Sequence, residues 1–166
     1  MPTKENALAA FAGESQANRK YLAFAKKAET DGFPQVAKLF RSAAEAETVH
    51  AHAHLRVLNG VKATTENLTE AIAGEYHEFS SMYPEFIKIA QQEGNKQAET
   101  SFKYAMAVEK IHHELYTQAL DAVTASKDLP EADIYVCSVC GNTVIGSAPD
   151  KCPICGVPKD KFMKMK

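Results

Sequence analysis

Apolar residues recur every three or four positions from about Lys4 to Ala125, as in the stretch AFAGESQANRKYLAFAKKAE. This spacing places the apolar side chains on one face of a helix, and the abundance of Ala, Glu, Lys, Leu and Gln favours helix throughout. Breaks that contain glycine fall at residues 31–35, 59–67 and 93–97. The pattern therefore predicts four long helices, with Pro84 expected to kink the third or to leave one backbone carbonyl without a donor.

The residue composition and the pattern of apolar positions change near Leu129. Short segments of high β-propensity, IYVC and NTVI, follow there among glycines and prolines. The pattern therefore predicts a mainly α protein with a helical domain at residues 1–128 and a very small second domain at residues 129–166.

Composition narrows the class of protein. The chain has 45% hydrophobic and 24% charged residues and a net charge of −2, which is typical of a soluble globular protein and argues against a nucleic-acid partner. No apolar run is long enough to span a membrane, and the first residues, MPTKENALAAF, lack the basic and apolar regions of a secretion signal. We expect a cytoplasmic protein without membrane contact.

All four cysteines lie in two Cys-x-x-Cys pairs, Cys137 with Cys140 and Cys152 with Cys155. A reducing cytoplasm keeps thiols free, so metal binding is favoured over disulfides. Four thiolates around one metal also replace the hydrophobic core that so small a domain cannot build. The spacing alone leaves zinc and iron open.

The helical region carries one pattern twice, a glutamate followed 33 or 34 residues later by a Glu-x-x-His motif: Glu14 with Glu47 and His50, and Glu75 with Glu109 and His112. Residues three apart on a helix share a face. One Glu from each of two helices and a Glu-x-x-His from each of two others form the ligand set of carboxylate-bridged di-iron bundles. Such oxygen and imidazole ligands suit iron or manganese.

Two further residues extend this candidate site. Glu78 follows Glu75 by three positions, whereas the equivalent position after Glu14 is Ala17, so one half offers an additional carboxylate. Tyr21, two turns after Glu14, is a candidate to hydrogen-bond a ligand carboxylate. The remaining histidines are expected on the surface or in ordinary packing.

The segments FAGES, AKLFRSAAEAETVH and VEKIHHELY, followed by YVCSVCG and CPICGVPKDKF, resemble rubrerythrin over essentially the whole chain. The resemblance implies a ferritin-like four-helix bundle followed by a small rubredoxin-like domain with a four-cysteine metal site. It also implies two irons in a carboxylate-bridged site and one iron in the four-cysteine site, where zinc is a possible substitute.

Carried over by position, the resemblance makes Glu47 and Glu109 bridging ligands, Glu14 and Glu75 terminal ligands, and His112 a constant ligand. His50 and Glu78 become alternatives that one iron exchanges as its oxidation state changes. His50, Glu78 and Tyr21 are therefore the catalytic candidates. The implied metal ligands are Glu14, Glu47, His50, Glu75, Glu78, Glu109 and His112 in the helices and Cys137, Cys140, Cys152 and Cys155 in the tail.

Rubrerythrins are peroxidases, so the resemblance implies reduction of hydrogen peroxide to water in oxidative stress defence, with electrons delivered through the FeS₄ centre. The chain has no Gly-x-Gly-x-x-Gly nucleotide fingerprint. NAD(P)H is therefore expected to be oxidised by a separate reductase, with that reductase or a rubredoxin as electron donor. One alternative is a ferritin-like iron-oxidising or iron-binding protein with a structural zinc tail, and another is a purely structural bundle with solvated glutamates.

The connection between the second and third helices predicts a domain-swapped homodimer. In a ferritin-like bundle these two helices run parallel, so their connection must recross the bundle. Residues 59–66 span about 26–29 Å when fully extended, whereas a helix over residues 34–58 is about 37 Å long. We therefore expect the third and fourth helices of one chain to pack against the first two of another.

Overall fold

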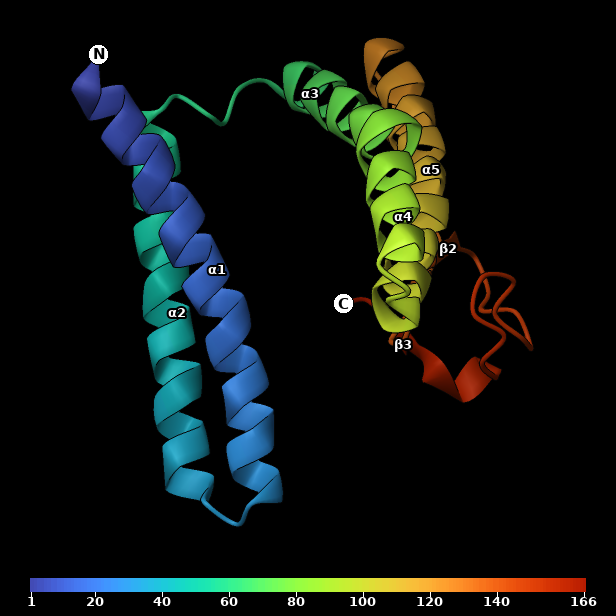
Figure 1. The fold of residues 1–166 in the computed structure, drawn as a ribbon. Helices are drawn as coiled ribbons and strands as arrows, with labels where there is room; N and C mark the ends of the chain where they lie inside the picture. The colour runs from blue at the N-terminus through green and yellow to red at the C-terminus, as the bar shows by residue number, and fades with distance from the viewer. The chain divides into compact units, whose positions relative to one another are not determined.

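The computed structural model describes residues 1–166, and Figure 1 shows its elements. The helices are α1 (Pro2–Thr30), α2 (Pro34–Val57), α3 (Thr64–His77), α4 (Tyr83–Gln92) and α5 (Lys96–Thr124), with a π-helical turn, η1 (Glu78–Met82), between α3 and α4. The strands are β1 (Ile134–Cys137), β2 (Thr143–Ile145) and β3 (Phe162–Lys164), and a 3₁₀ turn, η2 (Lys159–Lys161), precedes β3.

The chain divides into two compact units, an N-terminal unit of residues 1–62 and a C-terminal unit of residues 63–166. The prediction of four long helices is confirmed, with α3, η1 and α4 together forming the third. None of the helices combines the length and the apolarity that crossing a bilayer requires. The predicted division of the chain at residue 128 stays a prediction.

The N-terminal unit is a hairpin in which α1 and α2 lie side by side (Figure 1). Its core is made of small side chains, with Ala25, Ala28 and Ala37 buried and Phe40 packed against them. Small residues at such a contact let two helix backbones approach closely. Asn18 adds a polar link, because its buried side-chain amide donates to the Ala44 carbonyl at 2.7 Å and to Thr48 Oγ1 at 2.8 Å.

Most large apolar side chains of this hairpin lie outside its core. Leu39 is 68% exposed, Val57 is 65% exposed and Phe24 is 48% exposed. Because burial of apolar surface is the main favourable term in folding, a two-helix unit with an alanine core leaves much of that stabilisation unrealised.

The π-helical turn answers the question raised by Pro84. Proline has no backbone N–H, so a regular helix through this position loses one hydrogen bond. In η1 the helical turn instead contains one additional residue. The Tyr83 N–H donates to the Glu78 carbonyl, which lies five positions back and not four. Such single π turns are frequent at functional sites, and this one begins at the candidate ligand Glu78.

The C-terminal unit packs α3 and α4 along α5 (Figure 1). Ile87 and Ala90 of α4 and Val108 of α5 are buried there. The rings of Tyr83, Phe86 and Phe102 form an aromatic cluster, with centroids 5.6 to 6.2 Å apart.

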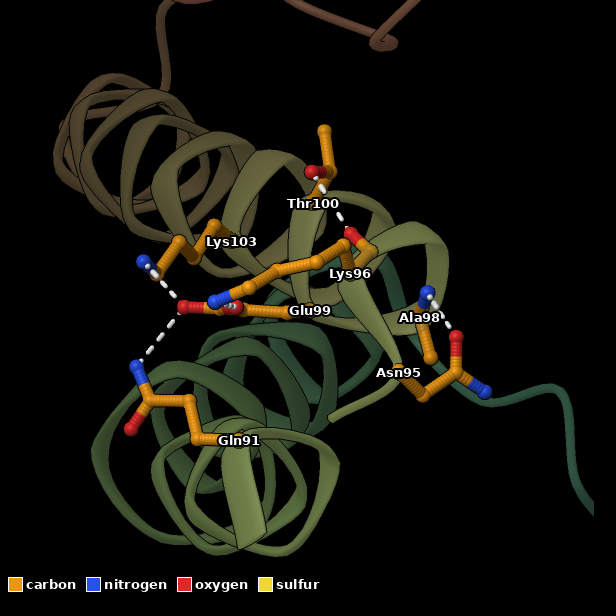
Figure 2. Close-up of polar contacts among 7 residues, drawn as sticks. All are labelled: Gln91, Asn95, Lys96, Ala98, Glu99, Thr100 and Lys103. Carbon is orange, nitrogen blue, oxygen red and sulfur yellow. Dashed lines mark hydrogen bonds and ion pairs between the residues drawn. The ribbon is translucent and has the colours of Figure 1, made fainter. Parts of the chain in front are cut away.

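A buried carboxylate ties α4 to the first turn of α5. Figure 2 shows Glu99, whose oxygens accept hydrogen bonds from Gln91 at 2.8 Å, Lys103 at 2.8 Å and Lys96 at 3.0 Å. The hydrogen bond from Lys103, followed by those from Gln91 and Lys96, lowers the pKa of Glu99 from 4.5 to about 2. Asn95 caps the same helix by accepting from the Ala98 N–H at 3.0 Å.

We expect Glu99→Gln to lower the melting temperature at pH 7 by several degrees. The folded-state pKa of Glu99 lies below its unfolded value, so its contribution is fully present above about pH 4.5 and is lost as the pH falls toward 2. Thermal unfolding of both proteins between pH 7 and pH 2 checks this, with Glu85→Gln as control because Glu85 is exposed. A difference that stays constant down to pH 2 contradicts the prediction.

The last strands form a small antiparallel sheet in the order β2-β1-β3. Tyr135 pairs with Val144 on one side and with Lys164 on the other. The first Cys-x-x-Cys pair begins at the last residue of β1, and the second lies between β2 and η2. The side chains of these cysteines take the place of a hydrophobic core in so small a sheet.

Candidate metal centres

The sulfur atoms of Cys137, Cys140, Cys152 and Cys155, which we call the sulfur cage, all lie within 4.8 Å of one another. Two opposite contacts, Cys137 Sγ to Cys155 Sγ and Cys140 Sγ to Cys152 Sγ, measure 3.7 Å and 3.6 Å. A tetrahedral metal with bonds of about 2.3 Å to sulfur needs sulfur atoms about 3.8 Å apart. The sulfur cage therefore fits one tetrahedral metal ion.

Two equivalent turns build the sulfur cage. The Gly141 N–H donates to the Cys137 carbonyl and the Gly156 N–H donates to the Cys152 carbonyl, both at 2.9 Å. Both glycines have positive φ, +85° and +78°, which a residue with a side chain rarely adopts. Each Cys-x-x-Cys-Gly segment thus closes into a tight turn that points its two sulfurs inward.

The electrostatics of the sulfur cage favour a thiolate at Cys152. Burial opposes ionisation of this thiol, but the backbone N–H groups of Cys155 and Ile154 and the thiols of Cys140 and Cys155 outweigh it and lower the pKa of Cys152 to about 6. Burial raises the pKa of Cys140. One sulfur is thus ready to bind a cation at neutral pH, and metal binding ionises the others.

Glu14, Glu47 and His50, which we call the first half-site, lie together in the N-terminal unit. Their ligand atoms lie within 4.8 Å of one another. His50 Nδ1 is 2.8 Å from Glu47 Oε2, as the three-residue spacing on α2 predicts. The His50 side chain is 55% exposed, whereas that of Glu47 is 18% exposed.

Glu75, Glu109 and His112, the second half-site, lie together in the C-terminal unit. Their ligand atoms also lie within 4.8 Å of one another. His112 Nδ1 is 2.8 Å from Glu109 Oε2 and 3.8 Å from Glu75 Oε1. Each repeat of the sequence pattern therefore folds into one cluster of two carboxylates and one imidazole.

Burial and neighbouring negative charge raise the pKa values of two carboxyls at or near the second half-site. Burial and the charge of Glu109 raise the pKa of Glu75 to about 7. The same two causes raise the pKa of Glu78. Half-buried acids with raised pKa values are typical of sites that hold a cation or take part in proton transfer.

Glu78 is set apart from the other predicted ligands. It is half-buried at the start of η1, and the group of close ligand atoms comprises Glu75, Glu109 and His112 without it. Tyr21 lies in the N-terminal unit with its ring 6.2 Å from that of Phe40. Its hydrogen bond to a ligand carboxylate stays a prediction, as do the metal-ligand and catalytic roles of the other residues.

Sequence reasoning missed Tyr83. Burial, followed by the charges of Glu78, Glu109 and Glu75, raises the pKa of its phenol. The hydroxyl therefore stays protonated close to a group of carboxylates. Its position directly before Pro84 is the one mark that the sequence gives it, and otherwise it is one aromatic residue among many.

Sequence reasoning also missed the link between the sulfur cage and the second half-site. Thr143 Oγ1 lies 2.9 Å from His112 Nε2. The preceding residue, Asn142, is 2% exposed, and its amide donates to Cys152 Sγ at 3.8 Å. No periodic pattern connects residues 31 positions apart on a helix and a strand.

Comparison with known proteins agrees with this interpretation. The sequence profile of the rubrerythrin family matches residues 5–120, and that of the rubredoxin-like domain of rubrerythrin matches residues 135–163. Rubrerythrin-2 of Clostridium acetobutylicum is 38% identical, over 92% of this chain and 91% of its own. Nigerythrin of Nitratidesulfovibrio vulgaris is 38% identical, over 96% of this chain and 85% of its own.

Solved structures give the same result. Nigerythrin in its mixed-valence state has 36% identity and a TM-score of 0.58, and the fully reduced, all-ferrous form has 36% identity and a TM-score of 0.59. Both matches cover 98% of this chain and 86% of the nigerythrin chain.

Fold and site define a ferritin-like helical protein with a carboxylate and histidine metal site and a rubredoxin-like four-cysteine domain, as the sequence predicts. The chain belongs to the rubrerythrin family. Members of this family are oxidoreductases of oxidative stress defence that carry a di-iron site and a rubredoxin-like site of four cysteines, and they are generally homodimers.

Proposed function

We propose that this protein is a non-haem di-iron peroxidase that reduces hydrogen peroxide to water with electrons delivered through its sulfur cage. The observation that carries the proposal is the presence, in one chain, of two Glu/Glu/His half-sites and a cage of four sulfurs. Each peroxide takes up two electrons and two protons and leaves as two waters. A diferrous pair supplies both electrons when bound, and the sulfur cage passes on replacements one at a time.

The two half-sites fit a pair of iron ions. In each, an imidazole Nδ1 lies 2.8 Å from a carboxylate oxygen of the same helix. Hard carboxylate oxygens with imidazole suit iron. In the proposal Glu47 and Glu109 would hold both ions as bridging ligands, Glu14 and Glu75 would be terminal ligands, and His112 would be a constant ligand.

Glu78 and His50 are proposed to alternate as ligands of one iron. The five helical glutamates, when ionised, leave a diferrous pair at a net charge of about −1 and a diferric pair at about +1. Binding the Glu78 carboxylate therefore favours the oxidised state, and the neutral imidazole of His50 favours the reduced state.

We propose that electrons originate from NAD(P)H through a separate reductase, with this reductase or a rubredoxin as direct donor to the sulfur cage. Cys140 and Cys155 are only partly buried, so a donor can approach that side of the cage. A site of four metal-binding thiols fits a reducing compartment, for which we propose the cytoplasm.

We also propose that the homodimer is domain-swapped, with each complete site formed by the first half-site of one chain and the second half-site of its partner. Six residues join α2 to α3 and span at most about 25 Å, whereas the 24 residues of α2 extend about 36 Å. The exposed apolar side chains of the N-terminal unit, such as Leu39 and Val57, supply a surface for a second copy to cover.

Rapid mixing of the reduced protein with peroxide tests the proposed reaction. About three irons per chain and re-oxidation faster by peroxide than by oxygen are expected. One zinc in the tail and faster re-oxidation by oxygen would instead favour the iron-oxidising alternative. Metal analysis and stopped-flow absorption of the FeS₄ band provide both readouts.

Glu78→Ala should lower the peroxide rate about tenfold or more while metal content falls much less. The reason is that three closer ligand groups remain in the second half-site. The matched control is Glu85→Ala, an exposed glutamate seven positions further along the chain. Equal losses of rate and of metal would mean that Glu78 is only a structural ligand.

A further inference from the structure

The two ligand histidines differ in what holds their second ring nitrogen. In both, Nδ1 faces a carboxylate at 2.8 Å. His112 Nε2 in addition lies 2.9 Å from Thr143 Oγ1, at the start of β2. The His50 side chain is 55% exposed, whereas that of His112 is 26% exposed.

We infer that Thr143 is a positioning residue of the helical metal site, which it serves by holding the His112 ring in one orientation and one tautomer. The inference rests on the proposed function, since it takes His112 as a metal ligand. The rubredoxin-like domain then has two roles: its sulfur cage delivers electrons, and its residue Thr143 orients a ligand of the helical site.

The hydrogen-bond inventory of Thr143 fixes the direction of the contact. A hydroxyl has one proton to donate and two lone pairs. Thr143 Oγ1 donates its proton to the Gly141 carbonyl at 3.1 Å. Toward His112 it can therefore only accept, so Nε2 carries the hydrogen and Nδ1 presents a lone pair.

That lone pair points at the place where a cation belongs. Nδ1 lies 2.8 Å from Glu109 Oε2 and 3.8 Å from Glu75 Oε1. A lone pair and a carboxylate oxygen repel at this distance unless a proton or a metal ion lies between them. A second hydrogen-bonded partner on the far nitrogen is the usual way in which proteins orient a ligand histidine and raise its basicity.

Thr143 is itself held firmly. It pairs with Val136 across the sheet, and the carbonyl of the adjacent Asn142 accepts from the Cys137 N–H at 2.9 Å. The contact with His112 also borders an apolar groove lined by Leu115, Leu129 and Ile145. The His112 ring is thus held on its Nε2 side by a residue of the sheet.

Full-length protein with zinc in the sulfur cage is the material for the test. Anaerobic calorimetric titration with Fe²⁺ should give a helical-site affinity about ten- to a hundredfold weaker in Thr143→Val than in the wild type. Valine matches threonine in shape and favours strands, so β2 is retained. Thr143→Ser keeps the hydroxyl and should restore the affinity. Thr117→Val, which removes a half-buried hydroxyl bonded to the His113 carbonyl, is the matched control and should bind as the wild type does.

A second measurement separates this inference from the proposed function. Histidine ¹H–¹⁵N spectra of the zinc-loaded protein, without iron, should show a His112 Nε2–H protected from exchange in the wild type and Thr143→Ser but not in Thr143→Val. Unchanged protection and unchanged Fe²⁺ affinity in Thr143→Val would overturn the inference. Protection in the wild type without any Fe²⁺ binding by the helices would uphold the bond and overturn the proposed function.

Discussion

Cys155→Ser is expected to abolish reduction of the helical site by an electron donor, while a chemically reduced helical site still consumes one equivalent of peroxide. The variant removes one of four sulfurs that lie within 4.8 Å of one another, and a serine hydroxyl does not replace a thiolate for a soft metal. Stopped-flow reduction by a rubredoxin, followed by a single-turnover peroxide assay, measures both halves of the prediction.

Ser138→Ala is the matched control for this experiment. Ser138 lies inside the first Cys-x-x-Cys pair and is exposed, so its loss leaves all four sulfurs in place. Both electron transfer and single turnover should be close to those of the wild type. If Cys155→Ser also lost the single turnover, the two metal centres would not act as separable parts.

Two inactive variants are expected to restore activity to each other when they are unfolded and refolded together. Glu47→Ala damages the first half-site and Glu109→Ala damages the second. In a swapped heterodimer, one site combines both damaged halves and the other combines both intact halves. Random pairing should therefore restore about a quarter of all sites, measured as peroxide turnover against the two separately refolded variants.

A second mixture provides the control. Glu14→Ala and Glu47→Ala both damage the first half-site, so no pairing of these chains creates an intact site. This mixture should stay inactive after the same treatment. Restored activity in the control, or none in the Glu47→Ala and Glu109→Ala mixture, would argue against a site shared between chains.

The helices and the ligand clusters could be predicted because both depend on local spacing. Residues three apart on a helix must face the same way, so Glu109 and His112 meet whatever surrounds them. Paired Cys-x-x-Cys motifs are equally local. Neither prediction required knowledge of how distant parts of the chain pack.

Features that depend on the packing of distant segments could not be predicted from the sequence. The sequence predicts a disturbance at Pro84, but it does not distinguish a kink from the π turn that the chain adopts. The contact of Thr143 with His112 joins a strand to a helix, and no periodicity specifies it. Tyr83 was missed for the same reason, because its neighbouring carboxylates come from α5 as well as from its own segment.

The π turn η1 amounts to the insertion of one residue into a regular helix. Each residue of an α-helix turns the chain by about 100°, so one extra residue rotates everything that follows relative to everything before. Glu75 precedes the turn and Glu78 begins it, and the buried Ile87 and Ala90 follow it. Because of this insertion, the continuous helix formed by α3, η1 and α4 directs both its carboxylates and its buried apolar residues toward α5. Deletion of one residue here would turn either the ligand carboxylates or the buried apolar residues away from α5.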